Sequence, residues 1–410
     1  MLVIHKVLIA ATAMLMLTAL RVNPVSADPR SESSIDQISQ YQEAIDSVQA
    51  QQGAYASQLG DLYLSLGRAH VDRQDYEKAI GAYTKGLQIE RINHGLNSLT
   101  QRPYLLSLAN TENLKGNWKQ SRSAINNLYQ INRQNYDSYD PKLLPVLDDI
   151  LSLLLETNGP QPANITYAKL IIAERIGKNI DTILTRDLDA DPQDASQRYR
   201  QLAFLHYRIA KHISQHGDTN NSGISFTTSE TLSNNSQSTS SHLHYQHGKR
   251  ALEKVVEYQV KQNTDNIPQQ ALAIAELGDW YLLFDRRKSA KNAYSLALTT
   301  LKSADPAPTD LALFDQPTMI EFTAQQHPVT RKTNLPDSID KPQLEVAMTI
   351  SALGKISDIE VVSSQTALSK QQLSNLKQNL RNIRFRPKLA DGILAASAHR
   401  AFFPLSLIEN

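Results

Sequence analysis

The chain has 410 residues, with 42 Lys and Arg against 41 Asp and Glu, and it contains no Cys. This length suggests roughly two to three domains, and the hydrophobic content of 41% is enough for a packed core. The near-neutral net charge argues against non-specific electrostatic binding to nucleic acid or to an anionic bilayer. The absence of Cys excludes disulfides, thiolate nucleophiles and Cys-ligated zinc.

Residues 1–27 have the pattern of an export signal. Lys6 precedes an unbroken apolar run of 14 residues from Val7 to Leu20, which is shorter than the about 20 residues that span a bilayer. Small residues then lead to a predicted cleavage site after Ala27. The alternative is that this segment is retained as an N-terminal anchor. We expect cleavage, and therefore a periplasmic protein without a membrane span in its mature chain.

Helical periodicity dominates residues 28–301. From Glu32 to Gln52, apolar residues recur every three or four positions, which predicts one amphipathic helix. After it, a Leu-small pair followed by aromatic and small residues recurs at fixed spacing. The members are Leu66, Gly67, Tyr76, Ala79, Tyr83 and Gly86, then more loosely Leu108, Ala109, Trp118, Ser121 and Ile125, and finally Leu277, Gly278, Tyr281, Ala290, Tyr294 and Ala297.

This pattern resembles the tetratricopeptide repeat. In that family the small residue lets the second helix of a hairpin approach the first, and the aromatic residue fills the space between hairpins. The first two segments lie 42 positions apart rather than about 34, so we expect a longer first hairpin. The alternative is an irregular helical bundle. The resemblance implies a concave face that holds another protein, with these first-helix positions on it: Asp61, Arg68, Asn110, Asn113 and Asp279.

Further helices are expected between the second and third segments. Leu143–Leu155 and Tyr167–Leu184 are amphipathic, and Ser196–Gln215 pairs with Tyr245–Val260 as a degenerate hairpin. The Ser- and Asn-rich stretch at 217–243 has almost nothing to bury, which predicts a disordered insert within that hairpin.

Three aspartates near position 190 mimic the start of a calcium loop. They are Asp187, Asp189 and Asp191, but Pro192 stands where the loop needs Gly. A turn between two helices explains the segment better, and we expect Asp194 to be the N-cap of the second helix.

The C-terminal part begins with a linker and ends in a small module. Residues 302–342 contain six Pro residues, which predict an extended linker that touches a neighbouring surface near Leu311–Phe314. Residues 343–410 then change to the alternating pattern of strands. The predicted order is β-β-α-β-β: strands at Leu344–Ile350 and Ile356–Val362, a helix opened by a capping box at Ser369 and Gln372, a strand at Ile383–Leu389, a hairpin turn at Asp391 and Gly392, and a last strand through Phe402.

This module resembles the C-terminal domain of the energy transducer TonB. The likeness lies in MTISALGKISDIEVVSS, in the helix that ends LRNIRFRP, in the turn ADG and in the closing RAFFPL. The resemblance implies a domain that pairs an exposed strand edge with an extended peptide. We expect that edge around Arg400, Phe402 and Phe403. The alternative is an ordinary α+β domain that only packs on the helical array.

The sequence contains no recognisable pattern of catalytic residues. We therefore predict that the chain is not an enzyme and binds no cofactor. Six of the 11 His residues cluster between 206 and 247, and a metal site is the weaker hypothesis beside a solvated surface. The cluster comprises His206, His212, His216, His242, His244 and His247. The metal candidates are His212 and His216, which are four apart on one helix face, with His242 and His244.

The sequence as a whole predicts an α+β multidomain protein, in which a helical hairpin array is followed by the small module. We expect a periplasmic scaffold of a Gram-negative bacterium that binds other proteins or peptides of the cell envelope. The alternatives are an accessory component of TonB-type transport and a metal-binding protein. Arg384, Arg386 and Lys388 alternate on one strand face, which we expect to be solvated or partner-facing rather than bound to nucleic acid.

Overall fold

The structure is a computed structural model of the chain. It describes residues 29–404 except for 157–160, 188, 218–240, 263–265, 304–312, 321–342, 365–367 and 391–392. The predicted export signal, nearly all of the predicted insert and most of the predicted linker lie outside the described residues. The described part is mainly helical with a small sheet region near its C-terminal end, so the predicted α+β class is confirmed.

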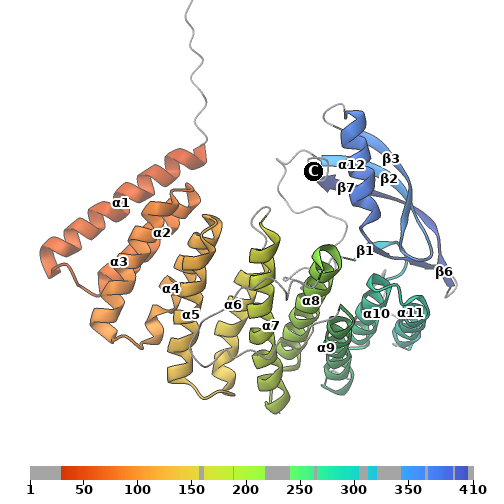
Figure 1. Ribbon diagram of the computed structural model, residues 1–410, viewed down its shortest axis with the longest axis horizontal. Coiled ribbons are helices and arrows are strands. Elements are labelled where there is room, and N and C mark those ends of the chain that lie inside the picture. Colours follow the sequence, from red (N-terminus) through yellow and green to blue (C-terminus); the bar gives the residue numbers. More distant parts are fainter. Residues whose placement is uncertain are drawn as a thin grey trace, which may run out of the picture. The chain divides into compact units, whose positions relative to one another are not determined.

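The chain divides into two compact units, residues 1–135 and 136–410. The first unit is a run of antiparallel helices (Figure 1). They are α1 (Pro29–Gln52), α2 (Gln58–Asp72), α3 (Tyr76–His94), the short 3-10 helix η1 (Leu99–Gln101), α4 (Arg102–Leu114) and α5 (Trp118–Asn135). None of the helices described in either unit is both long enough and apolar enough to cross a bilayer.

Helices of the first unit approach closely where one of them carries Gly. A Cβ atom at Gly67 of α2 would overlap the ring of Tyr83 of α3, so the ring lies directly against the α2 backbone. In the same way Tyr104 of α4 covers Gly86 of α3 and reaches Gly60 of α2. Tyr83 and Tyr104 are both almost fully buried. The aromatic residues therefore fill the space that the missing side chains leave, which gives close packing.

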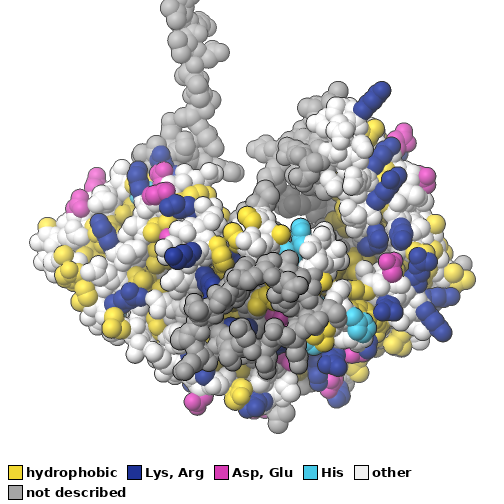
Figure 2. Space-filling view, in the orientation of Figure 1, with side chains coloured by type: hydrophobic (Ala, Val, Ile, Leu, Met, Phe, Trp, Pro, Cys, Tyr) yellow, Lys and Arg dark blue, Asp and Glu magenta, His cyan; other side chains and the backbone are white. Residues whose placement is uncertain are grey.

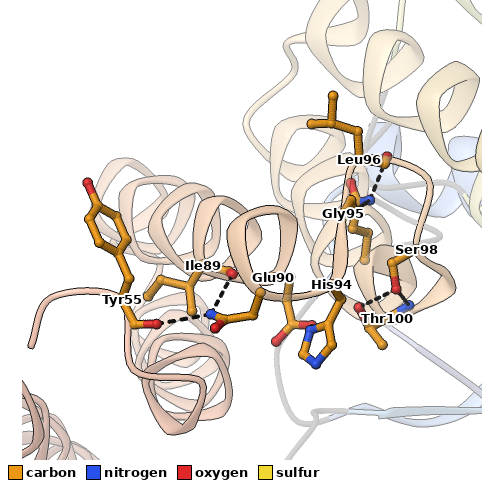
Figure 3. A network of polar contacts seen from close by, with 10 residues as sticks. Tyr55, Ile89, Glu90, His94, Gly95, Leu96, Ser98 and Thr100 are labelled. Carbon is orange, nitrogen blue, oxygen red and sulfur yellow. Dashed lines mark hydrogen bonds and ion pairs between the residues drawn. The ribbon is translucent and has the colours of Figure 1, made fainter. Parts of the chain in front are cut away.

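The connection from α3 to α4 contains η1 and lies within the 42 positions that separate the first two segments. Gln101 of η1 is fully buried, and its amide donates to the carbonyl oxygens of Leu96 at 2.7 Å and Gly95 at 3.2 Å. Arg91 of α3 donates to the side-chain oxygen of Gln101 at 2.9 Å. In Figure 3, Gly95, Leu96 and the Ser98–Thr100 pair lie in this connection, which follows His94 at the end of α3.

The second unit starts with further helical hairpins. Its helices are η2 (Pro141–Leu143), α6 (Leu144–Leu155), α7 (Ala163–Arg186), α8 (Pro192–His216), α9 (Ser241–Gln262), α10 (Ile267–Leu283) and α11 (Arg287–Lys302). The α8–α9 pair agrees with the predicted degenerate hairpin: Gln259 donates to Ser196 at 3.2 Å, and the rings of Tyr199 and Tyr258 lie 5.9 Å apart.

The predicted N-cap of α8 is wrong by three positions. Asp191, not Asp194, caps the helix, because its carboxylate accepts a hydrogen bond from the backbone N–H of Asp194 at 2.9 Å. Pro192 then occupies the first helical position, where its fixed φ and missing N–H are well tolerated.

The last hairpin, α10–α11, repeats the packing of α2–α3. A Cβ atom at Gly278 would overlap the ring of Tyr294, which is fully buried. Trp280 of α10 covers Gly248 of α9 in a similar contact, and its indole donates to the carbonyl oxygen of Tyr245 at 3.2 Å.

Three hairpins also share one turn geometry. The residue with positive φ is Gln74 (62°) between α2 and α3, Gly116 (82°) between α4 and α5, and Asp285 (55°) between α10 and α11. In each turn the next residue donates its N–H to a carbonyl five positions earlier, at 2.8 to 2.9 Å. The positive φ and this bond are those of a Schellman-type helix end, so the three turns are one motif.

The terminal module is built on a three-stranded antiparallel sheet in the order β3-β2-β7. Its strands are β2 (Gln343–Ile350), β3 (Ile356–Ser364) and β7 (Ser397–Pro404). Helix α12 (Lys370–Arg381) opens with the predicted capping box of Ser369 and Gln372. Leu376 and Leu380 of α12 are fully buried in one core with the inward residues of β2 and with Phe403 of β7.

The predicted strand Ile383–Leu389 does not join this sheet. It forms β4 (Phe385–Arg386), which pairs with β1 (Thr318–Met319) from the predicted linker, and β5 (Lys388–Ala390), which pairs with β6 (Ile393–Ala395). Pro387 lies between β4 and β5, and because Pro has no N–H it interrupts a ladder.

The described part of the predicted linker is packed rather than extended away from the fold. Leu313 and Phe314 are buried in a cluster with Tyr294 of α11. The carbonyl oxygen of Phe314 accepts a hydrogen bond from the N–H of Leu389 at 3.0 Å. Leu389 and Leu394 pack against the same cluster, so the module and the last hairpin share a hydrophobic core.

Candidate functional site

Strand β7 is an edge strand of the terminal module. Within the described residues it pairs only with β2, in a continuous antiparallel register from Gln343–Pro404 to Ile350–Ser397. Alternate residues of an edge strand direct their backbone N–H and C=O groups away from the sheet, where another extended chain can pair with them. Pro404 is the last residue of the strand. Pro has no N–H to donate, and at the end of an edge strand this does not interrupt the hydrogen bonds between strands.

The three residues predicted on this edge divide between the two faces of the sheet. Phe402 has 55% of its surface exposed, and Arg400 is also exposed. Phe403 points the other way and is 3% exposed in the core of the module. Since side chains alternate along a strand, Arg400 and Phe402 share the open face, and Phe403 holds the strand in place.

The module carries more positive than negative charge. Between residues 343 and 404 the sequence has eight Lys or Arg against four Asp or Glu. Lys and Arg side chains are frequent on the face of the module and of α10–α11 in Figure 2, on the right of the view. Arg400 lies 3.8 Å from Glu345 across the sheet. Glu345 is partly buried, but the side chain of Arg400 is 69% exposed, so its guanidinium is open to a partner.

The concave-face candidates of the first unit differ in exposure. Asp61 and Arg68 of α2 are exposed. Asn110 of α4 is partly buried, and Asn113 is buried with 3% of its surface exposed. Asp61 and Arg68 are therefore the two that a partner could contact directly.

Asp279 of α10 lies in a buried ion pair instead of on an open face. Its carboxylate accepts hydrogen bonds from Arg386 Nε at 3.0 Å and Nη2 at 2.6 Å. The hydroxyl of Tyr294 donates to the same carboxylate at 2.8 Å. The side chains of Asp279 and Arg386 are 9% and 8% exposed. Asp279 is thus occupied within the chain, and Arg386 is not the solvated residue that the strand pattern predicted.

The surroundings of this ion pair explain its charge state. Burial by itself lowers the pKa of Arg386, but the carboxylate of Asp279 and its hydrogen bonds raise the pKa above the ordinary value. Burial and the charge of Asp279 both raise the pKa of the Tyr294 hydroxyl, which stays a donor. The bidentate geometry satisfies both charges, as a buried pair requires.

A second polar cluster lies between α8 and α9. His206, His244 and His247 each place one ring nitrogen near the other two, and these three nitrogens lie within 4.8 Å of one another. The Nδ1 atoms of His206 and His244 are 3.1 Å apart, so one ring donates and the other accepts. His244 is fully buried, while His206 and His247 are partly buried. We call these three residues the histidine triad.

Charged neighbours come from α7. Burial, then the neighbouring His244 and His247, lowers the pKa of His206 well below its ordinary value. Burial also lowers the pKa of His247; Glu174 opposes that shift, whereas Lys178 adds to it. Glu174 is buried and forms an ion pair with Lys178 at 3.1 Å.

The other histidines of the sequence cluster lie apart from the triad. His212 is buried and stacks on Tyr167 with ring centroids 5.5 Å apart, and the rings of His212 and His216 are 4.7 Å apart. Among the described residues no third metal-binding side chain joins them. His242 is exposed. Of the four predicted metal candidates, only His244 belongs to the triad, whereas His206 and His247 were not singled out.

Comparison with known protein families gives no match for this chain, and no curated protein is significantly similar to it.

Proposed function

We propose that this chain is a protein-interaction scaffold of the bacterial cell envelope, with hairpins of the tetratricopeptide type and a terminal module that binds an extended peptide along β7. The observation that carries the proposal is the edge position of β7, which pairs on one side only among the described residues. An added strand satisfies the backbone groups of the second side and gains main-chain hydrogen bonds.

The side chains on the open face indicate what kind of peptide would bind. Phe402 offers a large apolar contact, and cross-strand pairs with aromatic residues stabilise a sheet. Arg400 and the excess of basic residues in the module favour a segment with acidic side chains, because complementary charge speeds association and rejects basic competitors. The proposed ligand is therefore an extended, acidic peptide with an apolar residue opposite Phe402.

The hairpins of the first unit support a second binding surface. Their internal packing uses Gly–Tyr contacts, whereas Asp61 and Arg68 are exposed on α2. Residues of this kind are free to serve recognition. The two surfaces would let the scaffold hold two partners at once.

Site-specific crosslinking in cells tests the strand-addition proposal. A photoreactive phenylalanine analogue at Phe402 should form a covalent adduct with a partner. The same analogue at Leu296, an equally exposed apolar position on α11, should form none. Phe402→Asp should then abolish recovery of that partner with the tagged protein, and Leu296→Asp should retain it. Equal adducts at both positions, or no adduct at Phe402, would contradict the proposal.

A further inference from the structure

The histidine triad has the ligand set of a transition-metal site. A tetrahedral zinc ion binds imidazole nitrogens at about 2.0–2.1 Å, which places two ligand nitrogens about 3.3–3.4 Å from each other. The Nδ1 atoms of His206 and His244 are already 3.1 Å apart, and all three ring nitrogens lie within 4.8 Å. Small rotations of the rings would therefore be enough to place an ion among them.

The helices hold the three rings in place without an ion. His244 and His247 are three positions apart on α9 and so share one helix face. The ring of His206 stacks on His244 at 5.3 Å and meets His247 edge-on at 5.0 Å. A site whose ligands already face one another loses little entropy on binding an ion.

The chemistry of the donors selects the class of metal. Three imidazoles suit zinc, copper, nickel and cobalt, whereas magnesium and calcium prefer oxygen donors. Three protein ligands leave a fourth position for water.

We propose that His206, His244 and His247 bind one divalent transition-metal ion of the zinc type, which ties α8 to α9. This site is independent of the strand edge at β7, because no residue is shared between them. The ion links two helices of one hairpin and so adds a fixed bond to a pair that is otherwise held by side-chain packing. Binding therefore stabilises the hairpin as well as occupying the site.

Zinc titration of the purified protein, without a polyhistidine tag, tests the site by calorimetry. The wild type should bind one zinc ion per chain, copper and nickel should compete, and magnesium should not bind. His206→Asn and His247→Asn should each weaken the affinity at least about tenfold, since even residues that only orient a metal ligand change affinity about 10–100-fold. The matched controls are His242→Asn and His216→Asn, which change exposed histidines of the same two helices and should bind as the wild type does.

Anomalous diffraction from zinc-soaked crystals of the wild type gives a second readout that does not need a variant to fold. The anomalous peak should lie among the three rings. Three outcomes would overturn the proposal: no stoichiometric zinc in the wild type, a peak elsewhere on the chain, or equal loss of binding in the His242 and His216 controls. In each case the triad is a metal-free imidazole cluster joined by its own hydrogen bond.

Discussion

The first and the last of the matched hairpins, α2–α3 and α10–α11, have the same interior and different exteriors. In both, a Tyr ring on the second helix lies against a Gly on the first, and the turn has a residue with positive φ. The residue after that Gly is Arg68 in the first hairpin, where it is exposed, and Asp279 in the last, where it is buried against Arg386. The Gly–Tyr contact is common to both hairpins and stabilises each of them. The residue after the Gly differs: Arg68 faces solvent, and Asp279 contacts the terminal module.

The largest expected effect is the loss of the Asp279–Arg386 ion pair. Arg386→Met should lower the free energy of unfolding of the second unit by about 3–5 kcal/mol, because it leaves a buried carboxylate without its counter-ion. The corresponding change in the first hairpin, Arg68→Met, should alter stability by less than about 0.5 kcal/mol. Urea denaturation of both variants measures the contrast.

The double variant Asp279→Leu with Arg386→Met controls for lost packing. It should be more stable than Arg386→Met alone, because an apolar pair has no unpaired charge to bury. If the double variant is as unstable as the sum of the two single variants, the ion pair does not couple the two residues.

The shared interior predicts equal costs for the two Gly–Tyr contacts. Gly67→Ala and Gly278→Ala should each destabilise the protein by about 1–3 kcal/mol, since the added methyl group overlaps a buried Tyr ring. Gly81→Ala is the matched control on the exposed face of α3, where nothing lies within 4 Å of the added atom. It should stabilise the helix by about 0.5–1 kcal/mol. A neutral Gly67→Ala would show that the hairpin does not need the close approach.

The shared turn predicts opposite effects at its three equivalent positions. Gln74→Gly and Asp285→Gly should each stabilise the protein by about 1 kcal/mol, because L-residues other than Gly are strained at positive φ. Gly116→Ala should destabilise it by a similar amount at the same turn position. Thermal unfolding of the three variants decides whether the turns are equivalent in energy as well as in geometry.

The smallest expected effect is a pH dependence within the terminal module. Burial lowers the pKa of His399, whose ring lies 5.4 Å from that of Phe385. In the unfolded chain the ring has the higher pKa, so the unfolded state takes up the proton first as the pH falls. His399 therefore contributes full stability above about pH 6.5 and loses it below that value.

The variant His399→Gln tests this pH dependence. The stability difference between the wild type and the variant should be constant between pH 7.5 and 9 and should shift in favour of the variant at pH 5.5. Denaturation at these three pH values measures it. A difference that does not change with pH would rule out a buried neutral ring at this position.

Much of the fold follows from local sequence patterns. The Gly and Tyr spacing identified the α2–α3 and α10–α11 hairpins, because their packing depends on residues within one hairpin. The capping box at Ser369 and Gln372 is local in the same way, and the structure has both of its hydrogen bonds.

The contacts that sequence patterns missed are those between distant segments. Arg386 alternates like a solvated residue, and its burial depends on Asp279, which lies 107 positions earlier. The triad joins His206 to two residues of another helix, so the i,i+4 spacing of His212 and His216 pointed to the wrong pair. Strand β1 comes from a Pro-containing segment that has no alternating pattern of its own.

Hydrogen exchange in native conditions tests most directly the central claim, that the terminal module and the last hairpin form one folded unit through Arg386. In the variant Arg386→Met, backbone amides of α10 and of β4 should exchange faster together, while those of α2 and α3 keep their wild-type rates. Faster exchange in β4 with α10 unchanged would contradict this account, since it would mean that the module unfolds without disturbing the hairpin.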